Sequence, residues 1–106
     1  MRKNSRSVIE MNRFEGCKVL WKKRYRSKTT RLLKYVEAII QTTDNRLYYV
    51  DGECENDSWE GFSISLSVHR VESFDPQTKT FKKLPGYVQI SLDEAEYLEE
   101  LLFRDV

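Results

Sequence analysis

A run of cations and aromatic rings occupies residues 18–31 of the chain, KVLWKKRYRSKTTR. Lys and Arg side chains neutralise phosphates, and aromatic rings stack on unpaired bases, each stack contributing about 1–3 kcal/mol. The rings available for stacking are Trp21 and Tyr25. The cations beside or between them are Lys18, Lys22, Lys23, Arg24, Arg26, Lys28 and Arg31. The sequence therefore predicts a surface for single-stranded nucleic acid along this run.

A core role for the two rings is an equally good interpretation of the same residues. Period two places Trp21 and Tyr25 on one face of a strand with Val19, and also with Cys17 and Lys23. If the Val19 face is buried, both rings are core residues, and the opposite face would grip the phosphate backbone while other aromatic residues stack. The residues of that opposite face are Lys18, Leu20, Lys22, Arg24 and Arg26.

Other chemistry finds little support in the residue types. The single histidine, His69, lies among serines of an alternating segment without an acidic partner near it in sequence, and no glycine-rich phosphate loop is present. Cys17 and Cys54 lack metal-ligand spacing, and we interpret both as reduced thiols. The acidic segment that starts at Asp51 has no glycine at the sixth position and no acid at the twelfth position of a calcium loop. We therefore expect no enzyme, no cofactor and no metal site.

Charge is distributed unevenly along the 106 residues. Residues 1–34 carry a net charge of +10 and the remainder −9, an asymmetry that favours contact with a polyanion. Residues 1–12 have the composition of a basic flexible arm, and residues 13–106 have the length of one domain. The chain shows neither a secretory signal nor a membrane-spanning stretch, so we expect a cytoplasmic or nuclear protein without membrane contact.

Four strands are predicted before the C-terminal segment. They cover residues 17–26, about 31–42, 46–51 and 61–73, with a hairpin turn at Asp44 and Asn45. Residues 30–43 also fit one face of a helix, but the following turn favours a strand. A bulge or bend is expected near His69 and Arg70, where the alternation changes phase, and residues 74–86 are expected to form a loop or hairpin tip.

The chain is predicted to finish with an amphipathic helix that begins at a capping box. Ser91 is the expected N-cap, and Glu94 follows three residues later. The fold class is therefore α+β, a four-stranded antiparallel curved sheet followed by a C-terminal helix. Apolar residues form one stripe of this helix: Leu92, Ala95, Leu98, Leu101 and Leu102.

Three segments of the second half carry a family resemblance. They are NRLYYVDGE at residues 45–53, the alternating strand that follows, and ISLDEAEYLEELL at residues 90–102, preceded by the Asp75-Pro76 turn and the basic residues 79–83. Over residues 45–104 the chain resembles the single-stranded nucleic-acid-binding group that includes the coactivator positive cofactor four, the Whirly proteins and the Pur repeats. The group's aromatic-Lys-Gly-Lys segment would fall on residues 59–62, where both lysines are absent, so the resemblance carries over only Trp59, as a stacking ring.

The resemblance implies a homodimer that binds single-stranded nucleic acid, DNA in preference to RNA, with little sequence specificity. The dimer would be joined through Leu98, Leu101 and Leu102, which places the acidic helix away from the basic sheet. The alternative is a small protein-interaction module, an inhibitor or adaptor of phage or bacterial type. In that interpretation a protein partner binds the acidic loop 51–60 or the C-terminal helix.

Overall fold

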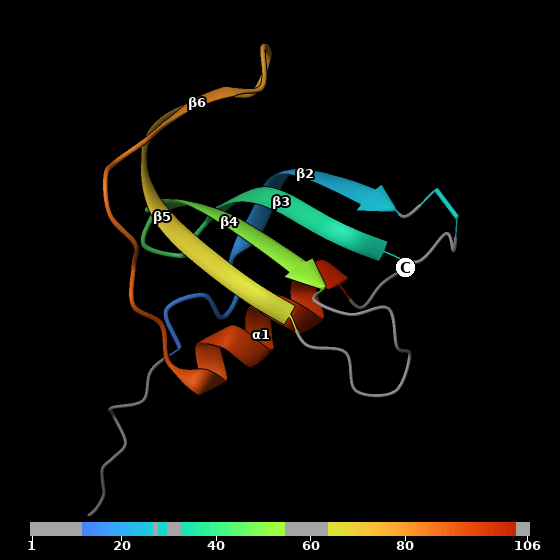
Figure 1. Ribbon diagram of the computed structural model, residues 1–106. Coiled ribbons are helices and arrows are strands. Elements are labelled where there is room, and N and C mark those ends of the chain that lie inside the picture. The colour runs from blue at the N-terminus through green and yellow to red at the C-terminus, as the bar shows by residue number, and fades with distance from the viewer. Residues whose placement is uncertain (1–11, 27, 30–32, 55–63, 104–106) are drawn as a thin grey trace, which may run out of the picture.

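The computed structural model describes residues 12–26, 28–29, 33–54 and 64–103 (Figure 1). In this part of the chain one antiparallel sheet has five strands in the order β2-β3-β4-β5-β6, and a C-terminal helix follows. The elements are β2 Lys18–Arg26, β3 Leu33–Gln41, β4 Leu47–Cys54, β5 Ile64–Asp75, β6 Thr80–Lys83 and α1 Leu92–Phe103. The α+β class, the antiparallel sheet and the C-terminal helix are confirmed, with five described strands where four were predicted.

The pairing of β3 with β4 decides between strand and helix for residues 30–43. Residues 35–41 of β3 pair with residues 47–53 of β4, and the turn lies at Asp44 and Asn45 as expected. Asn45 adopts a φ of 68°, in the left-handed region that Asn tolerates. The Thr42 amide donates to the Arg46 carbonyl at 2.9 Å, and the Thr42 hydroxyl donates to the Asp44 carboxylate. The side chain of Thr42 thus fixes the turn from inside.

A bulge at Leu20 changes which side chains of β2 share a face. Val19 lies opposite Ile40, whereas Trp21 lies opposite Ile39. Directly opposed residues of antiparallel strands project to the same side of the sheet, so Val19 and Trp21 project to opposite sides. The prediction that put Trp21 on the Val19 face is therefore wrong, because one extra residue reverses the period-two alternation.

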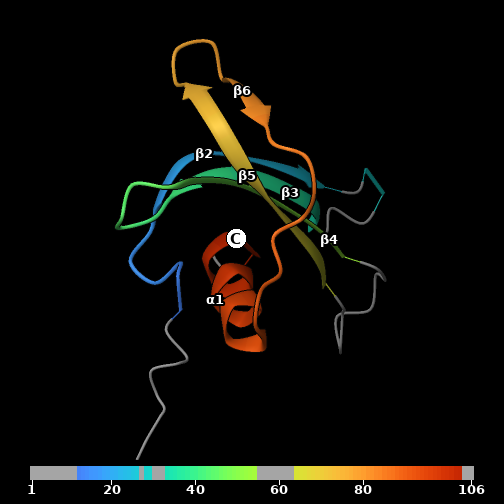
Figure 2. The same ribbon diagram turned by 90° about the vertical axis from the view of Figure 1, so that its left-hand side faces the viewer.

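The fifth strand lies within the segment that was predicted to be a loop or hairpin tip. β5 pairs first with β4 and then, from Val71 onward, with β6, and the turn between β5 and β6 begins at Pro76. The expected irregularity is a register shift between Val71 and Ser73, slightly beyond His69. Figures 1 and 2 show β5 curving so that the β5–β6 hairpin rises from the side of the sheet opposite α1.

The side of the sheet that faces α1 holds the main core. Gly52 on β4 allows α1 to approach, because a Cβ at this position would lie 2.8 Å from the Phe103 ring and 2.7 Å from the Leu66 side chain. Phe14, from the segment before β2, meets the Tyr48 ring edge-on at 5.2 Å between centroids. The buried members of this cluster are Phe14, Val36, Ala38, Ile40, Tyr48, Val50, Val68, Leu98, Leu102 and Phe103.

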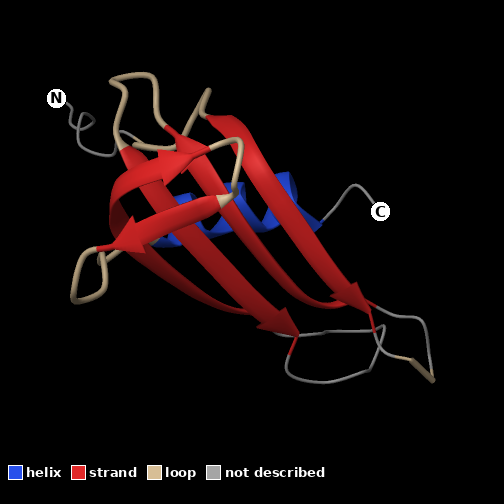
Figure 3. Cartoon of the chain, turned by 90° about the horizontal axis from the view of Figure 1, so that it is seen from above, coloured by secondary structure: helices blue, strands red, loops and turns tan. Residues whose placement is uncertain are grey.

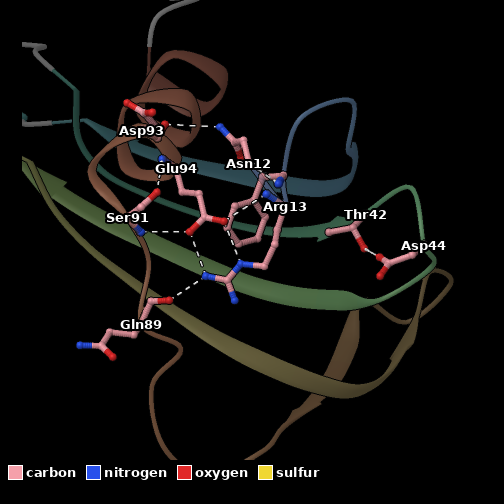
Figure 4. Close-up of polar contacts among 9 residues, drawn as sticks. Asn12, Arg13, Thr42, Asp44, Gln89, Ser91, Asp93 and Glu94 are labelled. Atoms are coloured by element: carbon pink, nitrogen blue, oxygen red, sulfur yellow. Dashed lines mark hydrogen bonds and ion pairs between the residues drawn. The ribbon is translucent and has the colours of Figure 1, made fainter. Parts of the chain in front are cut away.

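The predicted capping box is present and is extended by Arg13 (Figure 4). The Ser91 amide donates to Glu94 Oε1 at 3.0 Å, and the Glu94 amide donates to Ser91 Oγ at 3.1 Å. Arg13 donates to Glu94 through Nε at 2.8 Å, Nη2 at 2.9 Å and its own amide at 3.0 Å. Its Nη2 also donates to the Gln89 carbonyl at 2.7 Å. These donors, led by the Arg13 guanidinium, lower the pKa of Glu94 to about 2.

The helix leucines that were predicted at a dimer interface lie mostly in the core of the single chain. Leu98 and Leu102 are fully buried, and Leu101 is half-buried. The first two therefore have no surface to offer to a partner. The helix also does not lie away from the basic strand. Lys22 is opposite the core residue Ala38, so it projects to the side of the sheet that α1 covers.

Candidate nucleic-acid interface

We term the side of the sheet opposite α1 the open face, and Figure 3 views the sheet from this side, with the helix behind it. Three rows of side chains cross it from β2 to β5. The first row holds mostly apolar and aromatic residues, the second is charged, and the third pairs two tyrosines with an acid. The rows are Trp21, Ile39, Tyr49, His69; Lys23, Glu37, Asp51, Ser67; and Tyr25, Tyr35, Glu53, Ser65.

Five rings form a continuous line along the first row, which we term the aromatic row. Phe81 of β6 stacks on Tyr49 with 4.9 Å between centroids and lies 6.3 Å from Trp21. His69 lies 6.0 Å from Tyr49 and 4.6 Å from Tyr87, which follows β6. Tyr49, in the middle of the row, is buried, with 4% of its surface exposed. Tyr87, at the end of the row, is 76% exposed.

Three exposed lysines surround the β2 end and the middle of this row. Lys83 of β6 holds Nζ 4.9 Å above the Tyr49 ring. Lys23 follows Trp21 on the open side of β2; it lies opposite Glu37 in the second row, with Nζ 5.3 Å from the Tyr25 ring of the third row. Lys18 lies opposite Gln41, whose position in β3 projects to the open face. The aromatic row therefore lies between cations from both ends of the described chain, a combination that suits stacked bases and their phosphates.

The far half of the open face is acidic and internally bonded. Glu37 accepts hydrogen bonds from the hydroxyls of Tyr25 and Tyr49, both at 2.7 Å, and Asp51 accepts one from Tyr35 at 3.3 Å. Burial, followed by hydrogen bonds to Tyr35 and Glu37, raises the pKa of Tyr49, so its hydroxyl stays protonated as a donor. Together with Glu53, these carboxylates repel phosphates. An anionic ligand on the open face is thereby confined to the aromatic row.

The predicted nucleic-acid residues are divided between the two sides of the sheet. Lys22 and Arg24 project to the helix side, because they lie opposite the core residues Ala38 and Val36. Lys28 is exposed in a turn, and Arg26 is exposed at the end of β2. Arg31 and Trp59 lie outside the described residues. The open face collects the remaining four, which are Lys18, Trp21, Lys23 and Tyr25.

The sequence interpretation missed the contribution of the C-terminal half to this face. Phe81 and Lys83 were assigned to a loop, although the alternation of TFKK at residues 80–83 is the signal that a short strand is present. His69 was placed among the serines of an alternating segment, and the structure shows it half-buried between two tyrosines. Residues 87–90 read as a strand-like run in the sequence, but Tyr87 belongs to neither strand nor helix in the structure.

Comparison of the chain with protein-family models, curated proteins and solved structures finds no match. In the part of the chain that the structure describes, no cluster of His, Cys, Asp and Glu has the arrangement of a metal site. Within the same residues, α1 is neither long nor apolar enough to cross a membrane. The geometry of the open face is thus what remains to indicate a function.

Proposed function

We propose that the chain binds single-stranded nucleic acid, with little sequence preference, across the first row of the open face. The observation that carries this proposal is the aromatic row, bordered by Lys18, Lys23 and Lys83. Rings accept every base because each base has a π face, and lysines contact the backbone without reading sequence. In the part of the row that the lysines border, the rings accessible to bases are Trp21 and Phe81, both half-buried, because Phe81 covers Tyr49.

The same rings also serve the fold, and both roles are compatible. Ile39, Tyr49 and Val71 form a second buried cluster beneath Phe81, against which Trp21 also packs. A purely structural cluster would explain these buried members. It would not explain why Lys83 lies over the Tyr49 ring while Lys18 and Lys23 stand before and after Trp21 on the open side of β2.

The test compares two triple variants with the same change in net charge. One variant replaces Lys18, Lys23 and Lys83 by Gln. The other replaces Arg46, Lys79 and Lys82 by Gln; all three are exposed and lie outside the aromatic row. Binding of single-stranded and duplex oligonucleotides is measured by gel shift over a range of salt concentrations. We expect the first triple to weaken single-strand binding and to reduce the slope of log affinity against log salt by about 2, or about 0.7 per contact.

Two outcomes would contradict the proposal. Equal losses in both triples would indicate attraction to net charge without a site on the open face. A wild-type chain that binds neither single strands nor duplexes, even at low salt, would remove the function itself. We keep three further predictions as part of this proposal: a homodimer, a cytoplasmic or nuclear location, and the family resemblance. Each needs its own measurement, and light scattering tests the dimer.

A protein-interaction module is the second candidate, and one groove favours it. The groove has a volume of about 720 Å³ and lies between the segment before β2 and the outer side of α1. Its lining includes Tyr97 and Leu101 together with four carboxylates, a composition that suits a basic protein segment. The four are Glu15, Asp93, Glu96 and Glu100. Two results together would support this candidate. The wild-type chain would bind a basic protein partner but no nucleic acid, and Glu96→Lys would abolish binding of that partner.

A further inference from the structure

A second groove lies at the edge of β5, where residues 84–89 connect β6 to α1. It has a volume of about 520 Å³, within the range of small-ligand sites. Its lining consists of Arg13, Arg70 and residues 84–89, so no carboxylate side chain of the described residues lines it. Tyr87 both lines this groove and ends the aromatic row. The groove therefore begins where the aromatic row ends and extends around the edge of β5 toward the helix side of the sheet, to which Arg70 projects because it lies opposite the core residue Tyr48.

The connecting segment is held on β5 by its backbone. The amides of Leu84 and Val88 each donate to a β5 carbonyl at 2.8 Å, one on either side of Gly86. Gly86 has a φ of 88°, which favours glycine, and its carbonyl lies 3.0 Å from Nδ1 of His69. The residues between these anchors form a short projecting loop of fixed shape. Anchoring the segment at both ends reduces the conformational entropy that a ligand would have to remove.

Tyr87 is the side chain that this loop presents. Its ring is 76% exposed and contacts the His69 ring at 4.6 Å between centroids. The fold gains little from so exposed a ring, whereas a base stacked on it would bury both surfaces.

Arg70 is the cation of the groove that is available to a ligand. Its side chain is exposed, and no described carboxylate forms an ion pair with it. Arg13, the other cation, already donates to Glu94 and to the Gln89 carbonyl. Arg70 and Tyr87 line the same groove, so a nucleotide bound there could place its phosphate on the guanidinium and its base on the ring.

We propose that this groove binds one nucleotide of the bound strand, with its base on Tyr87 and its phosphate on Arg70. The inference rests on the proposed function and adds to it a defined end of the binding path. A strand long enough to pass from Trp21 to Tyr87 would therefore bind more tightly than one that covers the lysine-bordered part of the row alone.

The experiment measures the affinity of oligothymidylates of two lengths, about 4 and about 12 nucleotides, a span that covers common site sizes. Tyr87→Ala should weaken binding of the long oligonucleotide at least about fivefold and leave the short one unchanged, while Tyr87→Phe should bind like the wild type. Leu92→Ala is the matched control, because Leu92 is 75% exposed and does not line the groove. Arg70→Gln should reduce the salt slope for the long oligonucleotide by about 0.7, whereas Arg46→Gln should leave it unchanged.

The results separate this inference from the function on which it rests. Unchanged affinity and salt slope in Tyr87→Ala and Arg70→Gln, with loss of binding in the Lys18, Lys23 and Lys83 triple, would reject the groove and keep the open face. An equal reduction of slope in Arg46→Gln would also reject it, because the effect would then be one of general charge. Circular dichroism of each variant confirms that the sheet is intact.

Discussion

The two faces of the sheet belong to the same strands but are covered by different parts of the chain. On the helix side, α1 and Phe14 cover residues from β3, β4 and β5 and leave ten residues buried in one cluster. On the open face a short hairpin covers one end of the sheet, and three residues are buried beneath it. The helix side therefore carries most of the stability, and the open face keeps accessible rings and charges on a rigid support.

The division of β2 between these faces depends on one inserted residue. Without the bulge at Leu20, Trp21 would project with Val19 toward α1, and the cations of even number would project to the open face. With the bulge, Trp21 and Lys23 reach the open face. The cation-rich strand β2 thus contributes side chains to both sides of the sheet. Its Trp21 ring, which lies near Phe81, is on the side that α1 does not cover.

The largest expected effect tests whether the helix leucines are core residues. Leu102→Ala should lower the free energy of unfolding by about 2–5 kcal/mol, because it removes a fully buried side chain and leaves a cavity. Leu92→Ala, at an exposed position on the same helix, should change it by less than about 0.5 kcal/mol. Urea unfolding measures both. If Leu102→Ala kept full stability but converted a dimer to a monomer, the leucine would be an interface residue instead.

A smaller effect is expected where Arg13 joins the start of α1. Glu94→Gln keeps an acceptor for the Ser91 amide but removes the charge that Arg13 contacts. We expect a loss of about 2–3 kcal/mol near neutral pH, since Glu94 is buried and its partner is half in solvent. Because folding lowers the Glu94 pKa from 4.5 to about 2, this contribution is complete above the unfolded value and disappears as the pH falls toward 2.

The pH dependence supplies the control for that variant. Unfolding curves of the wild type and of Glu94→Gln should differ at neutral pH and converge near pH 2. Glu96→Gln, at an exposed position of the same helix, should follow the wild type throughout. A constant difference between wild type and Glu94→Gln at every pH would show that packing of the side chain, and not its charge, stabilises the helix start.

Local patterns predicted most of the fold because they depend on neighbouring residues. The capping box at Ser91 and Glu94, the turn at Asp44 and Asn45, and the alternation of β5 all follow from interactions within a few positions. The bulge at Leu20 could not be predicted in this way, since it follows from the pairing of β2 with β3 and from burial of Ile39 under the hairpin. A period-two reading assumes no insertion, so one bulge reverses every later assignment.

Only the β2 part of the candidate site could be predicted from the sequence, because local patterns do not show which distant segments pair. Trp21 and Lys23 were identified from a short run of sequence, but Phe81, Lys83 and Tyr87 join them through strand pairing between distant segments. Residues 79–83 had been compared with a basic loop, and their role on the sheet depends on the curvature of β5. No pattern within residues 74–90 specifies that the hairpin folds over Tyr49.

The smallest expected effect concerns that hairpin. Phe81→Ala removes the ring that stacks on Tyr49 at 4.9 Å, but Phe81 is half-buried and β6 is short. We expect a loss of about 1–2 kcal/mol, less than for Leu102, and confined to the open face because the main cluster does not include Phe81. Hydrogen exchange should show faster exchange of the amides in residues 71–83, with no change in residues 36–40. Phe81→Leu, which keeps apolar volume without a ring, should protect the hairpin almost as well. If Phe81→Ala accelerated exchange equally on both faces, the two clusters would unfold as one unit, and the open face would not be the independent, lightly closed surface on which the proposed binding depends.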